Sequence, residues 1–321
     1  MAPAASAESE RGREAQRPTE IPKAGWRDIL LRVKQQMAED RLSIIAAGVA
    51  FYALLAALPA LFALMSIYGL MFDAGEVVKQ ISAMRGVLPG EALDMIVALL
   101  QELTRADNTA LGLGVAGGVL LALWTASAGV RTMMEALNVA YDEEERRNFF
   151  KRAAQSLLLT LGAVVAGALT FAAVVLLPAV IGLLGLGDFA EKLVSFVRWP
   201  ILAAVFWAGI VVMYRYGPSR QHPQWAWASV GAIATTVLWL LGSALFSLYV
   251  SQFGNYNKTY GSMGAVVILL MWLLLTSYLV LVGAEINAET ERQTKRDTTT
   301  GKPKPMGQRH AYAADTVGPT P

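Results

Sequence analysis

Six long runs without any Asp, Glu, Lys or Arg divide the chain, and they constrain its fold more than any other feature. The runs are 42–72, 108–130, 153–187, 199–214, 221–257 and 259–284. A helix needs about 20 apolar residues to cross the hydrocarbon core of a bilayer. Residues 193–197 extend the short fourth run, because the intervening Arg198 is close enough to a helix end to reach the headgroups. We therefore predict six transmembrane helices, at about 43–71, 109–130, 156–184, 195–214, 227–250 and 262–284.

The composition also favours an all-α, polytopic membrane protein. Only 16% of the residues are charged and the mean hydropathy is +0.44, whereas soluble domains average about 25% charged residues. The chain has no cysteine and only two histidines, so it offers no disulfide, thiolate or histidine-rich metal site. We expect no enzyme activity, no catalytic or metal-binding residues and no cofactor. A net charge of +2 gives no basic footprint for nucleic acid.

Lysine and arginine are unevenly distributed between the two sides of the predicted spans. Of the 27 in the chain, 21 fall in residues 1–41, 131–152, 215–220 and 285–321, and the other six fall on the opposite side. Basic residues accumulate in cytoplasmic loops. Both termini are therefore predicted to lie in the cytoplasm, and an even number of spans agrees with this N-in, C-in topology.

Residues 26–41 predict an amphipathic helix ahead of the first span. Its apolar face carries Trp26, Ile29, Leu30, Val33 and Met37, with basic residues elsewhere. This pattern is typical of a helix that lies in the interface of an anionic leaflet. A helix packed against loops of the bundle itself would show the same pattern, and both alternatives stay open.

The remaining segments outside the spans are a loop and two tails. Residues 73–107 predict two short periplasmic helices that break at Leu88-Pro89-Gly90, since proline suits the first turn of a helix. This loop could cap the bundle, lie on the membrane or re-enter it. The tails, 1–25 and 291–321, lack apolar periodicity and are predicted to be disordered.

Polar residues near the cytoplasmic ends of two spans are the first functional candidates. Arg131, Glu135 and Asn138 are spaced i, i+4 and i+7, which places them on one stripe of a helix. Glu285 and Asn287 follow the last span on the same side. At similar depth, Arg131 and Glu285 could pair across the bundle. Such groups either close helix ends and fix topology or face a substrate or ion.

A second set of candidates lies on the predicted outer side. Tyr256, Lys258 and Tyr260 form a polar cluster just ahead of the last span, and Arg198 flanks the fourth. Tyrosines at a span boundary are commonly anchors in the aromatic belt. Together with the two cations, they could instead make an outer patch for phosphate-bearing headgroups.

Several motifs, in this order, resemble the YihY/BrkB family of bacterial inner-membrane proteins, also called ribonuclease BN-like. The resemblance covers about residues 26–294 and rests on the following segments: AAGVAFY (46–52) with Pro59, ALNVAY (136–141) with Glu145-Arg146, Arg198-Trp199-Pro200, Tyr214-Arg215-Tyr216, YNKTYGS (256–262) with Gly264-Ala265, and GAEINA (283–288). The family pattern has leucine where this chain has Met263 and Ile286, and both changes conserve an apolar packing residue.

The resemblance implies a six-span protein of the bacterial inner membrane with both termini cytoplasmic, and no accepted biochemical activity. Some relatives are associated with export of lipid or lipopolysaccharide, and we treat the ribonuclease name as a misassignment. Transport or translocation of an amphipathic or anionic envelope substrate, such as lipid, is the function we favour. The alternative is a non-transporting envelope or scaffold protein. Expected partners are membrane lipids and envelope proteins, without nucleic acid, and the oligomeric state is not specified.

Overall fold

The computed structural model describes residues 11–71, 111–184, 187–252 and 262–321, and the regular elements in these ranges are helices. An all-α fold is therefore confirmed for this part of the chain. The long helices are α3 (Leu42–Met71), α6 (Leu111–Ala140), α7 (Phe149–Leu184), α8 (Gly187–Tyr216), α9 (Trp225–Gln252) and α11 (Ser262–Glu291). Three shorter elements are η1 (Pro18–Glu20), α2 (Lys23–Glu39) and α12 (Tyr312–Asp315). The predicted loop 73–107 lies outside the described residues.

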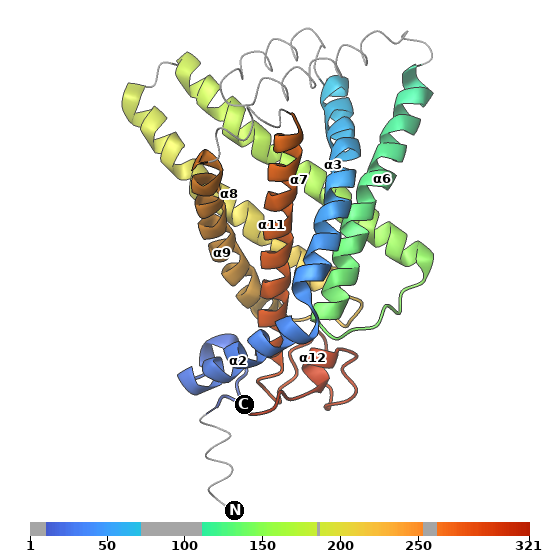
Figure 1. Ribbon diagram of the computed structural model, residues 1–321, viewed down its shortest axis with the longest axis vertical. Coiled ribbons are helices and arrows are strands. Elements are labelled where there is room, and N and C mark those ends of the chain that lie inside the picture. Colours follow the sequence, from blue (N-terminus) through green and yellow to red (C-terminus); the bar gives the residue numbers. More distant parts are fainter. Residues whose placement is uncertain (1–10, 72–110, 185–186, 253–261) are drawn as a thin grey trace, which may run out of the picture.

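The six long helices form a ring. Each helix packs against the next in chain order, and α11 packs back against α3. Figure 1 shows α3, α6, α9 and α11 converging towards one end, where α2, α12 and the C-terminus also lie, and spreading apart from there, while α7 crosses the bundle obliquely. We call the end where they meet the basic end, because it holds residues 11–41, 131–152, 215–220 and 285–321, which are rich in arginine and lysine.

Three helical stretches within the described residues are long and apolar enough to cross a membrane. They are Phe149–Ala168, Trp225–Val250 and Val266–Glu291. A fourth is added if α2 and the first half of α3, which meet at 66°, are taken as one bent span. The count of six spans and their orientation stay predictions, although six long helices are present.

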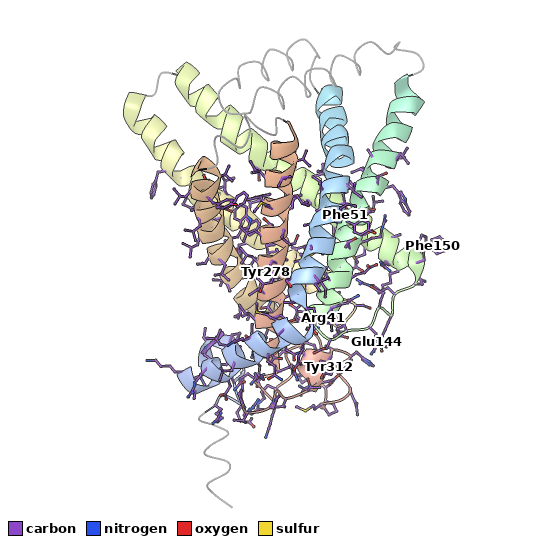
Figure 2. All side chains as sticks on the ribbon, viewed as in Figure 1. Arg41, Phe51, Glu144, Phe150, Tyr278 and Tyr312 are labelled. Carbon is purple, nitrogen blue, oxygen red and sulfur yellow. The ribbon has the colours of Figure 1, made fainter. Side chains whose placement is uncertain are left out.

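Large apolar side chains cover the outside of the ring. On α9, Leu241, Leu245 and Leu248 are spaced i, i+4 and i+7 and are 58%, 67% and 63% exposed. Phe150 at the start of α7 also points away from the bundle (Figure 2). A soluble protein rarely exposes contiguous apolar surface of this kind. Surfaces facing lipid have no such restriction, so this exposure agrees with a membrane location.

Several helices continue beyond the predicted ends of the spans. The last span was predicted to end at residue 284, but α11 runs to Glu291; α6 likewise reaches Ala140, and α7 begins at Phe149. The added turns carry charged side chains, which the charge-free runs excluded by definition. These turns extend the ring at the basic end, where partners for the charges are available.

Helix α2 packs one side of its apolar face on the protein. Ile29 and Val33 are 0% and 5% exposed and form a small core with Ile21 and Trp227. The contact is with helices α9 and α11, and a place in the membrane interface stays a prediction. Leu30 remains 58% exposed on the same helix, so that residue is available for an interface outside the chain.

The C-terminal segment is folded, which differs from the disorder predicted for residues 291–321. Arg309 donates hydrogen bonds to the backbone carbonyls of Lys295 (2.9 Å), Arg296 (3.1 Å) and Ala314 (2.6 Å). Gln224 N–H donates to Thr298 O at 2.8 Å and so attaches the segment to the start of α9. Polar contacts hold much of this segment, and Ala313 packs in the main apolar core; apolar periodicity gave no sign of the segment. Residues 11–25 of the N-terminal tail are also described and include η1 and the start of α2.

Glycines allow a close helix crossing between α9 and α11. A Cβ added at Gly231 would meet the backbone oxygen of Gly283, and one added at Gly283 would meet Thr235 Oγ1 and the Tyr214 hydroxyl. Helices in membranes approach closely where small residues face each other. The Tyr214 hydroxyl uses this approach to donate to Val280 O of α11 at 2.6 Å, while it also shares a 2.6 Å hydrogen bond with Thr235 Oγ1 of α9.

We predict that Gly283→Ala lowers the melting temperature of the purified protein in detergent. The added methyl group has no space at this crossing, and overpacking of this kind costs about 1–3 kcal/mol. The matched control is Gly162→Ala on α7, where an added Cβ meets nothing within 4 Å and helix propensity favours alanine. A Gly283→Ala protein as stable as the Gly162→Ala protein would contradict a close crossing at this position.

Candidate functional site

The last two turns of α11 gather an unusual set of buried polar side chains. Glu285, Asn287, Glu289 and Glu291 are each at most 1% exposed. Residues four apart share a helix face, so Glu285 and Glu289 share one face and Asn287 and Glu291 another. Burying ionised groups is costly unless each one has a partner. The contacts of these four residues therefore define the site, which we call the α11 polar cluster.

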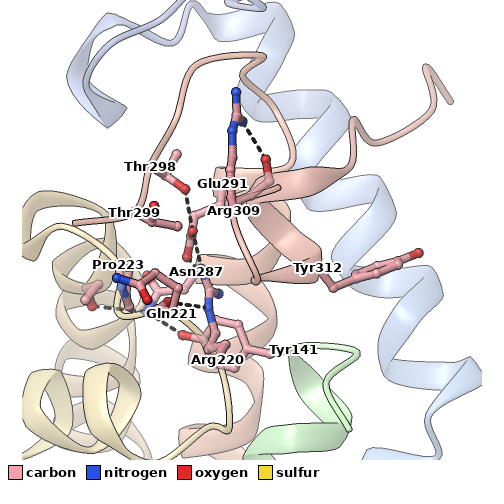
Figure 3. Close-up of polar contacts among 12 residues, drawn as sticks. Tyr141, Arg220, Gln221, Pro223, Asn287, Glu291, Thr298, Thr299, Arg309 and Tyr312 are labelled. Carbon is pink, nitrogen blue, oxygen red and sulfur yellow. Dashed lines mark hydrogen bonds and ion pairs between the residues drawn. The ribbon is translucent and has the colours of Figure 1, made fainter. Parts of the chain in front are cut away.

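Glu291 forms a fully buried ion pair with Arg220 from the loop between α8 and α9. The two guanidinium nitrogens of Arg220 donate to the two carboxylate oxygens at 2.6 and 3.1 Å, and both side chains are 0% exposed. Thr298 of the C-terminal segment adds a third hydrogen bond to Glu291 at 2.6 Å (Figure 3). Burial alone would lower the pKa of Arg220, but the adjacent Glu291 carboxylate raises it. The pair is therefore ionised.

Asn287 connects α11 to two neighbouring helices. Its side-chain oxygen accepts from Gly231 N–H at 2.6 Å, and its amide donates to Ala228 O on α9 at 3.0 Å. The amide also donates to the Tyr141 hydroxyl at 3.2 Å, just after α6. Arg220 lies over the Tyr141 ring, 5.0 Å from its centroid. Burial raises the pKa of the Tyr141 hydroxyl, with the Glu291 carboxylate adding to the effect, so Tyr141 stays a neutral hydrogen-bonding group.

Glu289 attaches helix α2 to α11. Its carboxylate accepts from Arg32 Nε on α2 and from Arg292. A second nitrogen of Arg32 donates to the Glu289 backbone oxygen at 3.1 Å and to Gln293 Oε1 at 2.8 Å. The side chains of Arg32 and Glu289 are only 4% and 1% exposed. Arg32 thus fixes the amphipathic helix to the end of the last long helix.

Asn138 joins α6 to both neighbouring loops. Its side-chain oxygen accepts from Ser219 N–H at 2.7 Å, and its amide donates to Glu145 at 3.1 Å. Glu145 also pairs with Arg147, whose Nη2 lies 2.6 Å from Glu145 Oε2. Burial alone would raise the pKa of Glu145, but the hydrogen bonds and charge of Arg147 lower it to about 2. Glu145 is therefore ionised at neutral pH.

The sequence-predicted stripe on α6 is divided in the structure. Asn138 is buried, whereas Glu135 is exposed and pairs with Arg152. Arg131 donates to Ser127 Oγ at 2.8 Å and lies 5.0 Å from the Trp124 ring centroid. No ion pair joins Arg131 with Glu285 in the ranges described. Glu285 instead faces the Asp40 carboxyl, which lies between α2 and α3.

The outer candidates receive less description. Arg198 lies within α8, and its side chain is not among those described. Tyr256, Lys258 and Tyr260 fall in 253–261, outside the described residues. Their role as an outer patch or as aromatic anchors stays a prediction.

Sequence reasoning missed most of the arginines and acids that hold the cluster together. The missed residues are Arg32, Asp40, Tyr141, Arg220, Glu289, Glu291, Gln293 and Thr298. One signal was present, because Glu285 and Glu289, like Asn287 and Glu291, are four apart and continue the helix face of the last span. Their partners Arg32, on α2, and Arg220, in the loop between α8 and α9, are distant in the sequence and could not be read from local spacing.

The arrangement is chemically suited to closing the basic end of the ring. Ion pairs and amide hydrogen bonds there join α6, α9 and α11 to one another and to residues 11–41 and 292–321. Among the residues that the structure describes, no group of three or more His, Asp or Glu side chains could hold a metal ion. Glu285 differs from its neighbours because one of its buried oxygens, Oε1, accepts no hydrogen bond from any described residue.

These features define a helical membrane protein whose charged groups are concentrated at one end. The chain belongs to the virulence factor BrkB family, whose model matches residues 33–308. The sequence-based resemblance to that family is thus confirmed.

Relatives are named as membrane proteins or as ribonuclease-like. Over 215 residues the chain is 31% identical to the ribonuclease-like protein YfkH of Bacillus subtilis, covering 64% of this chain and 75% of that protein. It is 30% identical to a UPF0761 membrane protein of Idiomarina loihiensis, over 69% of this chain and 75% of the relative. A UPF0761 membrane protein of Aliivibrio fischeri is also 30% identical, over 82% and 83%. No solved structure matches the chain.

We predict that Arg220→Ala strongly destabilises the protein. The substitution leaves the Glu291 carboxylate buried without its cation, and breaking a buried pair in this way costs about 3–5 kcal/mol. Arg296→Ala is the matched control, because its pair with Glu14 is 55% and 59% exposed and such pairs contribute about 0–1 kcal/mol. Thermal unfolding in detergent should separate the two variants clearly. Equal melting temperatures would show that Arg220 and Glu291 are not paired in the folded protein.

We also predict that the effect of Glu145→Gln depends on pH. In the folded protein the pKa of Glu145 is about 2, below its ordinary value of 4.5. The folded state therefore binds fewer protons than the unfolded state between these values, so this contribution to stability is complete above pH 4.5 and is lost as pH falls towards 2. The difference in melting temperature between wild type and Glu145→Gln should be largest near pH 7 and should shrink below pH 4.5. The exposed Glu144 (Figure 2) supplies the control, Glu144→Gln; a difference for Glu145→Gln that is constant with pH would argue against the Arg147 pair.

Proposed function

We propose that this chain is a six-span protein of the bacterial inner membrane, with both termini in the cytoplasm, and that it translocates an amphipathic or anionic envelope substrate such as a lipid. The observation that carries the proposal is the ring. Six long helices pack in chain order and close on themselves, and α3, α6, α9 and α11 spread apart from the basic end (Figure 1). A ring that is joined at one end and spreads towards the other is suited to alternating access from two sides of a membrane.

The charge distribution supports the orientation. The basic end contains 21 of the 27 lysines and arginines, and basic residues favour the cytoplasmic side. The α11 polar cluster would then close the bundle on its cytoplasmic side. Leu30 on α2 would face the cytoplasmic leaflet, where Lys23, Arg27 and Lys34 of the same helix can contact anionic headgroups.

Arg131 supports an anionic or amphipathic substrate. Its contacts in the described residues are a hydroxyl, Ser127 Oγ, and the Trp124 ring. Neither group neutralises its charge, in contrast to Arg32 and Arg220, which are paired with buried carboxylates. A cation that lacks a carboxylate partner near a membrane is a candidate for contact with a phosphate or carboxylate on a substrate.

Two buried polar atoms inside the apolar helices point in the same direction. Trp207 Nε1 on α8 and Ser243 Oγ on α9 have no hydrogen-bond partner within the described residues. A buried donor without a partner requires water or a ligand to satisfy it. Polar groups along the inside of the ring would suit a substrate with a polar headgroup.

A non-transporting scaffold is the second candidate, and the folded basic end favours it. Residues 11–41 and 292–321 form an ordered cap held by Arg13, Arg32 and Arg309. Such a surface could bind other envelope proteins at the membrane. Under this alternative, the cap would matter for function and Arg131 would not.

Reconstitution into liposomes tests translocation directly. Vesicles containing a fluorescent phospholipid are exposed to a membrane-impermeant reductant, which bleaches only the outer leaflet. In vesicles that contain the protein, we expect bleaching beyond the outer half, because inner-leaflet lipid is moved outward. Arg131→Ala should slow this phase at least several-fold, whereas Arg296→Ala should not. Translocation would be rejected if empty and protein-containing vesicles showed equal bleaching of the phospholipid and equal flux of anionic solutes. The scaffold would then be the remaining candidate.

RNA cleavage that co-purifies with the protein and requires a metal ion would instead support the ribonuclease name.

A further inference from the structure

The junction between α2 and α3 brings a carboxyl group against α11. Helix α2 ends at Glu39 and α3 begins at Leu42, and the two helices meet at 66°. Asp40 lies in the bend, where its N–H donates to the backbone oxygens of Ala38 and Gln36. The following residue, Arg41, has a φ of 52°. Both α2 and α3 pack against α11, and the bend brings the Asp40 carboxyl group near that of Glu285. Each of the two residues has one buried carboxyl oxygen without a hydrogen-bond partner among the described residues.

A hydrogen bond between two carboxyl groups requires a proton. Ionised carboxylates only accept hydrogen bonds, so one of the two groups must be protonated to donate. Asp40 Oδ2 and Glu285 Oε1 are also buried, and no donor group among the described residues reaches either oxygen. Glu285 is 1% exposed, whereas Asp40 is partly exposed. Water therefore has little access to compensate a negative charge on Glu285.

Within the described ranges no ion pair joins a cation to Asp40 or Glu285, which separates this pair from the other buried acids of α11. Glu289 is paired with Arg32 and Arg292, and Glu291 is paired with Arg220. These arginines are already engaged by their own carboxylates. The carboxyl groups of Asp40 and Glu285 therefore lie near each other without an arginine partner of this kind.

The charged groups around the pair are mostly acidic. They are Glu39 on α2, Asp142 just after α6 and Glu289 on α11, with Arg292 acting on Asp142 from the far side. Burial raises the pKa of Asp40, the hydrogen bond with Glu285 opposes this, and Glu39 adds to the rise. Asp142 is itself exposed. The negative charges of Glu39, Asp142 and Glu289 all favour retention of a proton at this junction.

We propose that Asp40 and Glu285 form a proton-binding site that holds one proton between the two carboxyl groups. Release of that proton leaves two carboxylates in contact, and their repulsion separates the α2–α3 bend from α11. Binding of the proton restores the hydrogen bond and closes the junction. This site goes beyond translocation, because it requires no substrate and would operate equally in a scaffold. If the chain does move a substrate, the site offers a way to couple that movement to protons.

Infrared spectroscopy of the purified full-length protein tests the proposal, since a protonated carboxyl group has its own C=O stretching band. Ordinary Asp and Glu side chains lose this band by about pH 6. The wild type should retain a band equivalent to one carboxyl group at pH 7 and lose it at higher pH. Glu285→Gln and Asp40→Asn should each lack the band at pH 7. Glu144→Gln removes an exposed acid from the same end of the bundle and should retain it.

The substitutions are chosen so that the fold survives. An amide at either position can donate to the remaining carboxylate, so each variant keeps a hydrogen bond without a shared proton. Melting temperatures in detergent should therefore stay within a few degrees of wild type at pH 7. Exchange of the backbone amides of residues 38–45, corrected for the intrinsic effect of pH, should rise in wild type as the band is lost and should not rise in Glu285→Gln.

Three outcomes would overturn the proposal. The first is the absence of the acid band from wild type at pH 7. The second is persistence of the band in both Asp40→Asn and Glu285→Gln, which would assign the proton elsewhere. The third is a gain in melting temperature with Na⁺, K⁺ or Ca²⁺ at pH 7 that requires both carboxyl groups, without any acid band, which would assign a cation in place of the proton. None of these measurements depends on translocation, so failure here would leave the proposed function standing.

Discussion

The buried ion pair between Arg220 and Glu291 is the interaction on which the basic end of the bundle depends. Both side chains are fully buried, and two charges in such a site are tolerated only when their hydrogen bonds are satisfied. Thr298 of the C-terminal segment donates a further hydrogen bond to Glu291, and the ring of Tyr141, just after α6, packs on the Arg220 guanidinium. One electrostatic requirement thereby specifies how a loop, a long helix and a tail fold together.

The pair can form only because α9 and α11 come close to each other. Gly231 and Gly283 leave no space for a side chain between the two backbones, and Asn287, one turn beyond Gly283, then reaches Gly231 N–H at 2.6 Å. Glu291 follows one turn later and meets Arg220 at the start of the α9 segment. Packing of small residues and pairing of charges are therefore successive steps along one helix face, which explains why the polar cluster lies directly beyond this close helix crossing.

The sequence predicted the centres of the helices well and their ends poorly. Charge-free runs locate the apolar segment of each helix, because the cost of burying charge in lipid is large and local. The same criterion stopped the last helix at residue 284, although α11 continues to Glu291. Asn138, Glu285 and Asn287, three of the polar residues selected from the sequence, are buried at the basic end, whereas Arg131 and Glu285 are not paired in the described residues. Arg32 and Arg220 could not be predicted as partners, because they are more than 70 residues from the acids they bind and local residue spacing does not indicate such long-range pairs.

The folded C-terminal segment was missed for a related reason. Arg309 holds it through hydrogen bonds to backbone carbonyls, and such contacts produce no apolar periodicity in the sequence.

The acids of α11 divide the basic end into a fixed side and an adjustable side. Glu291 faces Arg220 and Glu289 faces Arg32, so α11 is attached by permanent charges to the α8–α9 loop and to α2. Glu285 lies one turn before Glu289 on the same face, yet it meets Asp40, a second acid. An arginine pair keeps its strength over the whole physiological pH range, whereas a carboxyl pair holds together only while it shares a proton. The α2–α3 bend is thus the part of this end whose attachment to α11 depends on a titratable contact. A ring of helices that must open at one end requires such a contact beside fixed ones, because movement at a single junction changes the opening without dissolving the whole network.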